Sequence, residues 1–125
     1  MLAKLEGGEE ALLFSSGMAA AVSVFQALNP GDHIVAPTIM YWGLREWLID
    51  FTEKWDIGLT LYNATDENAL ADSIVNKKTK LIWIETPCNP TWDIIDISAA
   101  VKIAKSCGAK LVIDSTLSLI HISEP

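Results

Sequence analysis

Two apolar runs of this sequence each stop abruptly at polar residues that could take part in chemistry. The first run leads into Glu-Thr-Pro-Cys-Asn-Pro at 85–90, and the second, one strand–helix–strand unit later, leads into Asp-Ser-Thr at 114–116. Ligands of open α/β sheets bind beyond the carboxyl ends of the strands. If both runs are strands, Glu85, Asn89 and Asp114 meet at one edge of a sheet, which predicts a shared ligand site there.

A further candidate site lies near the N-terminus, in the run Ser15-Ser16-Gly17-Met18. A strand that passes through small residues into a helix leaves free backbone N–H groups at the helix N-terminus. These donors and the helix dipole favour a bound phosphate, and glycine lets the backbone approach it closely. An ordinary strand-to-helix turn with nothing bound explains the same residues, and both interpretations stay open at this point.

Tyr41 and Asn89 are the remaining side chains that could take part in chemistry. An aromatic ring at the start of a helix could lie over a planar cofactor, and its phenol could transfer a proton. The alternative is a Tyr-Trp pair packed in the core. Asn89 lies between two prolines, which remove backbone donors and stiffen the loop around its amide. The alternative there is a rigid loop that binds nothing.

The elements that must position these residues alternate between short apolar runs and segments with helical periodicity. We expect the helix at 66–75 to be capped by Thr65 or Asp66, and the helix at 97–107 to end at Gly108. Such alternation predicts an α/β fold with a mostly parallel sheet and helices on both faces. The predicted strands are 11–16, 33–37, 59–63, 80–86 and 110–115, and the predicted helices are 17–28, 41–55, 66–75 and 97–107.

Composition narrows the range of possible functions. A length of 125 residues with 50% hydrophobic residues suits one small domain, and the net charge of −7 argues against nucleic-acid binding. The isolated positions of His33, His121, Cys88 and Cys107 argue against a metal site. Two unpaired thiols fit a reducing, cytoplasmic location.

The stretch 11–28 contains no charged residue and reaches the minimum length of a membrane-spanning helix. The small residues at 15–17 interrupt it, and Asn29-Pro30-Gly31 stops it. We therefore expect a strand, a turn and a buried helix here, with a membrane span as the alternative.

Four motifs in this order resemble the Cys/Met-metabolism family of pyridoxal-phosphate enzymes, the cystathionine synthase and lyase group. The resemblance implies that residues 1–116 are part of the aspartate-aminotransferase-like (type I) large domain, at the N-terminal end of a longer enzyme. Trp42 replaces a family glycine, which puts substrate preference in doubt, and Ser115 replaces the usual asparagine. The motifs are Phe-Ser-Ser-Gly-Met at 14–18, Tyr-Trp-Gly at 41–43, Glu-Thr-Pro-Cys-Asn-Pro at 85–90 and Asp-Ser-Thr at 114–116.

The resemblance also implies a role for each matching residue. The N–H groups of Gly17 and Met18 would bind the phosphate of pyridoxal 5'-phosphate, and Tyr41 would stack on its ring. Asn89 would bond the ring oxygen, and Asp114 would keep the ring nitrogen protonated, while the motif glutamate would order the site. The implied cofactor-binding residues are Gly17, Met18, Tyr41, Glu85, Asn89, Asp114 and Thr116, with Tyr41 also catalytic.

In the intact parent, the resemblance implies trans-sulfuration: γ-elimination or γ-replacement on cystathionine or homoserine esters. It implies an amino-acid substrate and a homo-oligomer, a dimer of dimers, with neither nucleic acid nor membrane as a partner. The family's essential lysine follows the Asp-x-Thr motif, and no lysine follows Thr116 here, so we expect the 125-residue chain to be inactive. Residues 117–125 do not match the family's continuation and are interpreted as a tail of doubtful native origin, with a divergent loop as the alternative.

Two functions from other classes compete with this resemblance. A nucleotide-binding module, Rossmann-like or flavodoxin-like, would share the alternating elements and the phosphate-binding turn. It would also need a Gly-x-Gly-x-x-Gly motif or a Walker lysine after the first strand, and the sequence has neither. The other alternative is a non-catalytic interaction domain.

Overall fold

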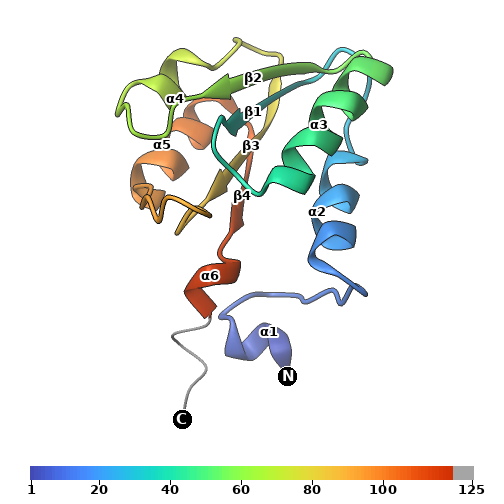
Figure 1. The fold of residues 1–125 in the computed structure, drawn as a ribbon, viewed down its shortest axis with the longest axis vertical. Coiled ribbons are helices and arrows are strands. Elements are labelled where there is room, and N and C mark those ends of the chain that lie inside the picture. The colour runs from blue at the N-terminus through green and yellow to red at the C-terminus, as the bar shows by residue number, and fades with distance from the viewer. Residues whose placement is uncertain (120–125) are drawn as a thin grey trace.

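The computed structural model describes residues 1–119 and contains a four-stranded sheet with helices on both faces (Figure 1). All strand pairs are parallel, and the spatial order is β2-β1-β3-β4. The predicted α/β class and parallel sheet are therefore confirmed. The strands are β1 (His33–Pro37), β2 (Gly58–Tyr62), β3 (Thr79–Glu85) and β4 (Lys110–Asp114), and the helices are α1 (Leu2–Leu5), α2 (Gly17–Phe25), α3 (Trp42–Lys54), α4 (Ala69–Asp72), α5 (Ile97–Cys107) and α6 (Thr116–Leu119).

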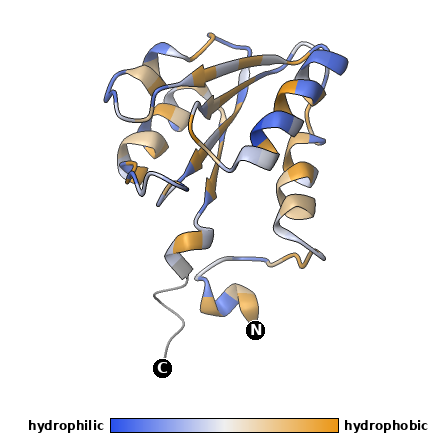
Figure 2. Cartoon of the chain, viewed as in Figure 1, coloured by the Kyte–Doolittle hydropathy of each residue, from blue (hydrophilic) through white to orange (hydrophobic). Residues whose placement is uncertain are grey.

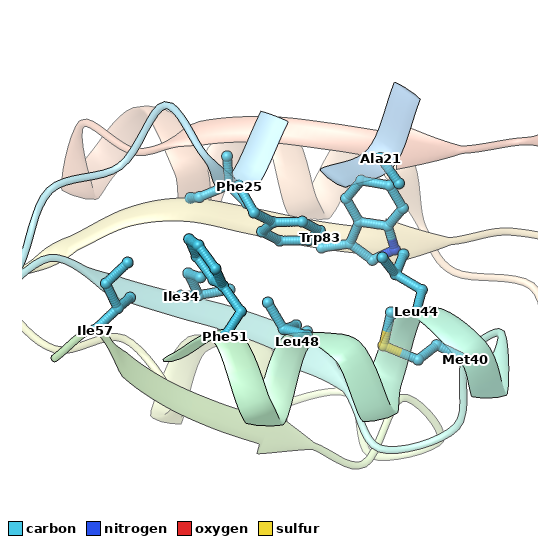
Figure 3. Packing of buried hydrophobic residues seen from close by; sticks show 11 residues of the cluster. Ala21, Phe25, Ile34, Met40, Leu44, Leu48, Phe51, Ile57 and Trp83 are labelled. Atoms are coloured by element: carbon cyan, nitrogen blue, oxygen red, sulfur yellow. The ribbon is translucent and has the colours of Figure 1, made fainter. Parts of the chain in front are cut away.

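One hydrophobic core lies between the sheet and the helices α2 and α3 (Figure 3). Phe25 of α2 packs beside Trp83 of β3, with ring centroids 5.1 Å apart. Leu44 and Leu48 reach the same core from α3 and are almost fully buried. Burial of each such side chain contributes about 1.5–3 kcal/mol relative to exposure, so this core fixes α2 and α3 on the sheet.

A second core lies on the opposite face, under α4 and α5. Successive side chains of a strand point to opposite faces of the sheet. Ile82 and Ile84 of β3 therefore face α5, whereas Trp83 faces α2 and α3. Glu85 follows Trp83 in the same alternation and brings a carboxylate to the α2 side. Figure 2 shows the strands largely in hydrophobic colours, as burial on both faces requires.

Helices α3 and α5 form close to where the sequence predicts them. Tyr41 is the N-cap of α3, and the side chain of Asp96 caps α5 by accepting a hydrogen bond from the N–H of Ala99 at 2.9 Å. Gly108 ends α5 in the left-handed conformation, with φ of 73°, as predicted. The strands β1 to β4 differ from their predicted bounds by at most one residue at each end.

The prediction of a strand at 11–16 is wrong. This segment has no regular secondary structure, no strand among residues 1–119 pairs with it, and Leu12 and Leu13 remain 80% and 82% exposed. A strand needs a hydrogen-bonded neighbour, and an apolar run alone does not supply one. Helix α2 is also shorter than predicted, because it ends at Phe25.

The predicted helix at 66–75 shrinks to the four residues of α4, and its N-cap is Asn68. Neither Thr65 nor Asp66 caps it. Asn63 accepts hydrogen bonds from the N–H and hydroxyl of Thr65, and Asp66 accepts one from the N–H of Asn68. Such local side-chain bonds compete with helix formation and delay its start.

The short helices α1 and α6 were not predicted from the sequence. Helix α6 includes the first residues of the proposed tail, whereas residues 120–125 lie outside the described part of the chain. The native or foreign origin of the tail therefore stays a prediction. Among residues 1–119, none of the helices combines the length and the apolarity needed to cross a membrane.

Candidate active site

A cavity of about 640 Å³ lies at the carboxyl ends of β3 and β4, beside the first turns of α2. Its volume falls within the range of small-molecule sites. The sequence predicts one ligand site at this edge of the sheet, and the cavity gathers every residue of that prediction. The predicted residues that line it are Gly17, Met18, Tyr41, Glu85, Asn89, Asp114 and Thr116.

The N-terminus of α2 forms one wall of the cavity. The first N–H groups of a helix have no intrahelical partner, and the hydroxyl of Ser16 takes up that of Ala19 at 3.1 Å. The N–H groups of Gly17 and Met18 remain for a ligand. A Cβ added at Gly17 would meet no atom within 4 Å, so open space lies in front of this backbone. The wall has the geometry of an anion site.

The opposite wall contains Asp114 at the end of β4. Asp114 pairs in register with Glu85, and its carbonyl oxygen accepts a hydrogen bond from the N–H of Thr86 at 3.0 Å. Its carboxylate oxygen Oδ1 accepts two bonds from Thr116, from the N–H at 3.1 Å and from the hydroxyl at 2.6 Å. Hydrogen bonds therefore restrain both the backbone and the side chain of Asp114.

Glu85 is only 5% exposed and joins two loops of the site. Its Oε2 accepts a hydrogen bond from the N–H of Tyr41 at 2.7 Å, and its Oε1 accepts one from the N–H of Asn89 at 2.9 Å. Burial raises the pKa of Glu85, and the negative charge of Asp114 adds to the rise, while the two N–H bonds oppose it. The carboxylate thus fixes the backbone at two predicted binding residues.

The ring of Tyr41 lies against Gly43 and is about half exposed. An ideal Cβ at Gly43 would approach the Cε1 atom of Tyr41 to 3.1 Å, which is closer than most packed contacts. Glycine at this position therefore lets the tyrosine ring fold back over the first turn of α3. Trp42, which departs from the family motif, is 73% exposed.

Sequence reasoning missed two features of the site: the capping of α2 by the Ser16 side chain, and the apolar side chains that line the cavity. Trp83 lies two residues before Glu85, and Val112 lies two residues before Asp114. Period-two alternation along each strand therefore places them on the face of the predicted acids, and this signal could have found them. The apolar lining includes Ala20, Ala21, Val24, Leu44, Trp83 and Val112.

Cys88 and the lysines contribute no reactive group to the cavity. Cys88 is buried, its thiol donates a hydrogen bond to the carbonyl oxygen of Ile39 at 3.2 Å, and burial raises its pKa. These properties favour packing over nucleophilic attack. No lysine lines the cavity, and Lys110 begins β4 at the end opposite Asp114. Within the described residues, no cluster of three or more His, Cys, Asp or Glu side chains could hold a metal ion.

Comparison with known proteins decides the family. The sequence profile of the Cys/Met metabolism PLP-dependent enzyme family, in which PLP is pyridoxal 5'-phosphate, matches residues 1–125. The chain belongs to this family.

Three relatives show how the chain compares with members of the Cys/Met metabolism family. It is 38% identical over 124 residues to the cystathionine beta-lyase MetC of Bacillus subtilis, covering 99% of the chain and 32% of that protein. It is 37% identical over 125 residues to the cystathionine gamma-synthase of Mycobacterium tuberculosis, with coverage of 99% and 32%. The crystal structure of cystathionine gamma-lyase from Lactobacillus plantarum, complexed with L-serine, superposes with a TM-score of 0.86 and 32% identity, covering 91% of this chain and 30% of that one.

The chain therefore spans about a third of the length of the curated relatives it matches. This agrees with the expectation that it is part of a longer enzyme. The superposition also agrees with the predicted large-domain fold, because it extends over nearly the whole described chain.

The residues of the cavity fit pyridoxal phosphate, the cofactor of the Cys/Met metabolism family. The cofactor carries a phosphate, a planar aromatic ring and a basic ring nitrogen. The cavity offers N–H donors at the start of α2, the ring of Tyr41, the amide of Asn89 and the carboxylate of Asp114. The individual binding role of each residue stays a prediction.

Proposed function

We propose that this chain forms much of the pyridoxal-phosphate site of an enzyme of sulfur amino-acid metabolism. The observation that carries the proposal is the single cavity that brings an anion-binding helix N-terminus together with Tyr41, Asn89 and Asp114. The family assignment favours this function over a nucleotide-binding module.

Each residue has a distinct task in the proposed site. The N–H groups of Gly17 and Met18 bind the phosphate, and the ring of Tyr41 covers the cofactor ring. Asn89 donates its amide N–H to the ring oxygen. Asp114 holds a proton on the ring nitrogen, since a carboxylate beside that atom stabilises the cation.

Proton transfer at the substrate completes the proposed chemistry. Bound pyridoxal phosphate supplies an electron-withdrawing ring that acidifies the Cα–H bond of an amino-acid substrate. Tyr41 lines the cavity, and its phenol is the group that would move a proton to or from the substrate. Val24, Trp83 and Val112 contribute apolar surface to the wall of the cavity.

For the intact parent we propose γ-elimination or γ-replacement on cystathionine or a homoserine ester. A second candidate is β-elimination, which is favoured by the 38% identity to a cystathionine beta-lyase. Incubation of the parent enzyme with cystathionine separates the two eliminations. Cysteine, 2-oxobutanoate and ammonia are the products of γ-elimination, whereas homocysteine, pyruvate and ammonia are the products of β-elimination.

We also propose that the parent is a cytoplasmic homo-oligomer, a dimer of dimers. Two observations are compatible with this: Cys88 and Cys107 are free thiols, and β4 is an edge strand in the described sheet. Light scattering coupled to size-exclusion chromatography measures the mass of the parent, and a monomer at micromolar concentration would contradict the oligomer.

The binding proposal can be tested on the 125-residue chain with pyridoxal phosphate itself. Equilibrium dialysis and the absorbance of the cofactor give its affinity. Asp114→Asn removes the charge beside the ring nitrogen, and we expect it to weaken binding about tenfold or more. Asp72→Asn, at an exposed position on α4, is the matched control. Equal affinities for the two variants, or no binding by the natural sequence, would contradict the proposal.

A further inference from the structure

Thr116 donates two hydrogen bonds to the same atom of Asp114. Its hydroxyl donates to Oδ1 at 2.6 Å, and its backbone N–H donates to the same oxygen at 3.1 Å. The first distance is that of a strong bond between a hydroxyl and a charged oxygen. The hydroxyl hydrogen of Thr116 is therefore used in the bond to Asp114.

The backbone of Asp114 is fixed independently of Thr116. It pairs in register with Glu85, and the N–H of Thr86 donates to its carbonyl oxygen at 3.0 Å. The side-chain torsions are then the freedom that remains, and the two bonds from Thr116 restrict them. Within residues 1–119, no hydrogen bond reaches the second carboxylate oxygen, Oδ2, and Asp114 lines the cavity.

We propose that Thr116 is a positioning residue, which holds one oxygen of Asp114 so that the other is presented to the ring nitrogen of pyridoxal phosphate. This inference rests on the proposed function and refines it, because Thr116 acts through Asp114 and not by touching the cofactor. A carboxylate that is already oriented loses less side-chain freedom on binding, and preorganisation of this kind raises affinity.

The same two bonds could instead serve only to begin α6, which starts at Thr116. The two explanations predict different effects of Thr116 on the binding of different ligands. If Thr116 orients Asp114, its effect depends on the ring nitrogen. If it only begins a four-residue helix, its effect is the same for any ligand of the cavity.

The test compares two ligands on the 125-residue chain: pyridoxal 5'-phosphate and 1-deazapyridoxal 5'-phosphate, in which a C–H group replaces the ring nitrogen. Thr116→Val keeps the branched shape and the backbone N–H but removes the hydroxyl. We expect it to weaken binding of pyridoxal phosphate about tenfold, the effect of one hydrogen bond to a charged group, and to leave binding of the deaza analogue unchanged. Thr116→Ser keeps the hydroxyl and should retain the affinity of the natural sequence.

Several outcomes would overturn the inference. They are an equal loss of affinity for both ligands in Thr116→Val, no loss for either, or the same loss in Thr116→Ser. If the natural sequence binds neither ligand, the proposed function itself fails and the inference fails with it. If circular dichroism shows that Thr116→Val does not fold, the comparison of Thr116→Ala with Thr116→Ser provides the same contrast.

Discussion

The carboxylate of Glu85 accepts a hydrogen bond from the backbone N–H of Tyr41, 44 residues earlier in the chain, at 2.7 Å. Its other oxygen accepts one from the N–H of Asn89 at 2.9 Å. One buried side chain therefore ties the loop after β1 to the loop after β3. The two loops carry the aromatic ring and the amide of the proposed cofactor site.

Replacement of Glu85 by glutamine should loosen this connection. Glutamine has the same shape but offers only one acceptor oxygen, so one of the two N–H groups loses its partner. We expect Glu85→Gln to lower the free energy of unfolding by about 1–3 kcal/mol, the cost of an unsatisfied buried donor, and to weaken the binding of pyridoxal phosphate. Urea titration and equilibrium dialysis measure the two effects. Glu53→Gln, exposed on α3, is the control and should change neither.

The stability contributed by Glu85 should also depend on pH. Burial raises its pKa above the ordinary value of 4.5, so above that pH the folded protein retains a proton that the unfolded chain has released. This contribution is fully present below pH 4.5 and is lost as the pH rises through the raised pKa. The stability of the natural sequence relative to Glu85→Gln should therefore fall across this window. A constant difference in urea titrations from pH 4 to 8 would argue against the raised pKa.

His33 should make the stability of the protein depend on pH in the opposite direction. Its ring lies at the amino end of the sheet, with Nδ1 2.8 Å from the hydroxyl of Thr79 and Nε2 2.9 Å from that of Thr60. Burial lowers its pKa below 6.5, so just below pH 6.5 the unfolded chain binds a proton that the folded protein does not. Stability should rise with pH through this window and level off above 6.5. His33→Asn should flatten the rise in urea titrations, and because both proteins keep His121, the difference between them reports on His33.

Two glycine substitutions should show how packing around Tyr41 and open space at the start of α2 each affect cofactor binding. Gly43→Ala crowds the ring of Tyr41, whereas Gly17→Ala meets no atom within 4 Å and places a methyl group in the open space before the helix N-terminus. We expect both proteins to fold and to bind pyridoxal phosphate more weakly, about tenfold for a displaced ring or phosphate.

The matched control for these substitutions is Gly58→Ala, which crowds His33 at 2.8 Å, far from the cavity. It should lower the melting temperature while the folded fraction keeps the affinity of the natural sequence. A loss of affinity in this control equal to that in Gly43→Ala would show that binding follows global stability and not the position of Tyr41.

The sequence predicted those parts of the fold that depend on local signals. The strand from His33 to Pro37 and the helix from Ile97 to Cys107 have their predicted bounds, because a short apolar run marks the strand and a terminal glycine marks the end of the helix. The segment 11–16 failed because strand formation depends on a partner elsewhere in the chain.

In the site, too, features set by local sequence signals were predictable, and contacts between distant residues were not. Residues at strand ends, such as Asp114, were predictable because a carboxylate after an apolar run has few other uses. The bond between Glu85 and Tyr41 was not, because it joins residues far apart in sequence. The role of Gly43 was missed for a related reason: it depends on which way the ring of Tyr41 folds.

The 125-residue chain should not form a specific covalent bond with pyridoxal phosphate. Family enzymes hold the cofactor through a lysine, and no lysine lines the cavity here. The lysine nearest in sequence to Asp114 is Lys110, at the other end of β4, roughly 13 Å away at about 3.3 Å per residue. Reaction with the exposed lysines should be slow and scattered, because none of them lines the cavity where the cofactor phosphate would bind.

Borohydride reduction in the presence of the cofactor, followed by peptide mapping, measures this directly. We expect substoichiometric labelling spread over several of the lysines, with no turnover of cystathionine. Asp114→Asn should leave the labelling pattern unchanged, because the proposed site takes no part in it. One lysine labelled to completion, together with release of a cystathionine product, would show that the chain supplies its own catalytic amine and would overturn the expectation of inactivity. The lysines to be mapped are Lys4, Lys54, Lys77, Lys78, Lys80, Lys102, Lys105 and Lys110.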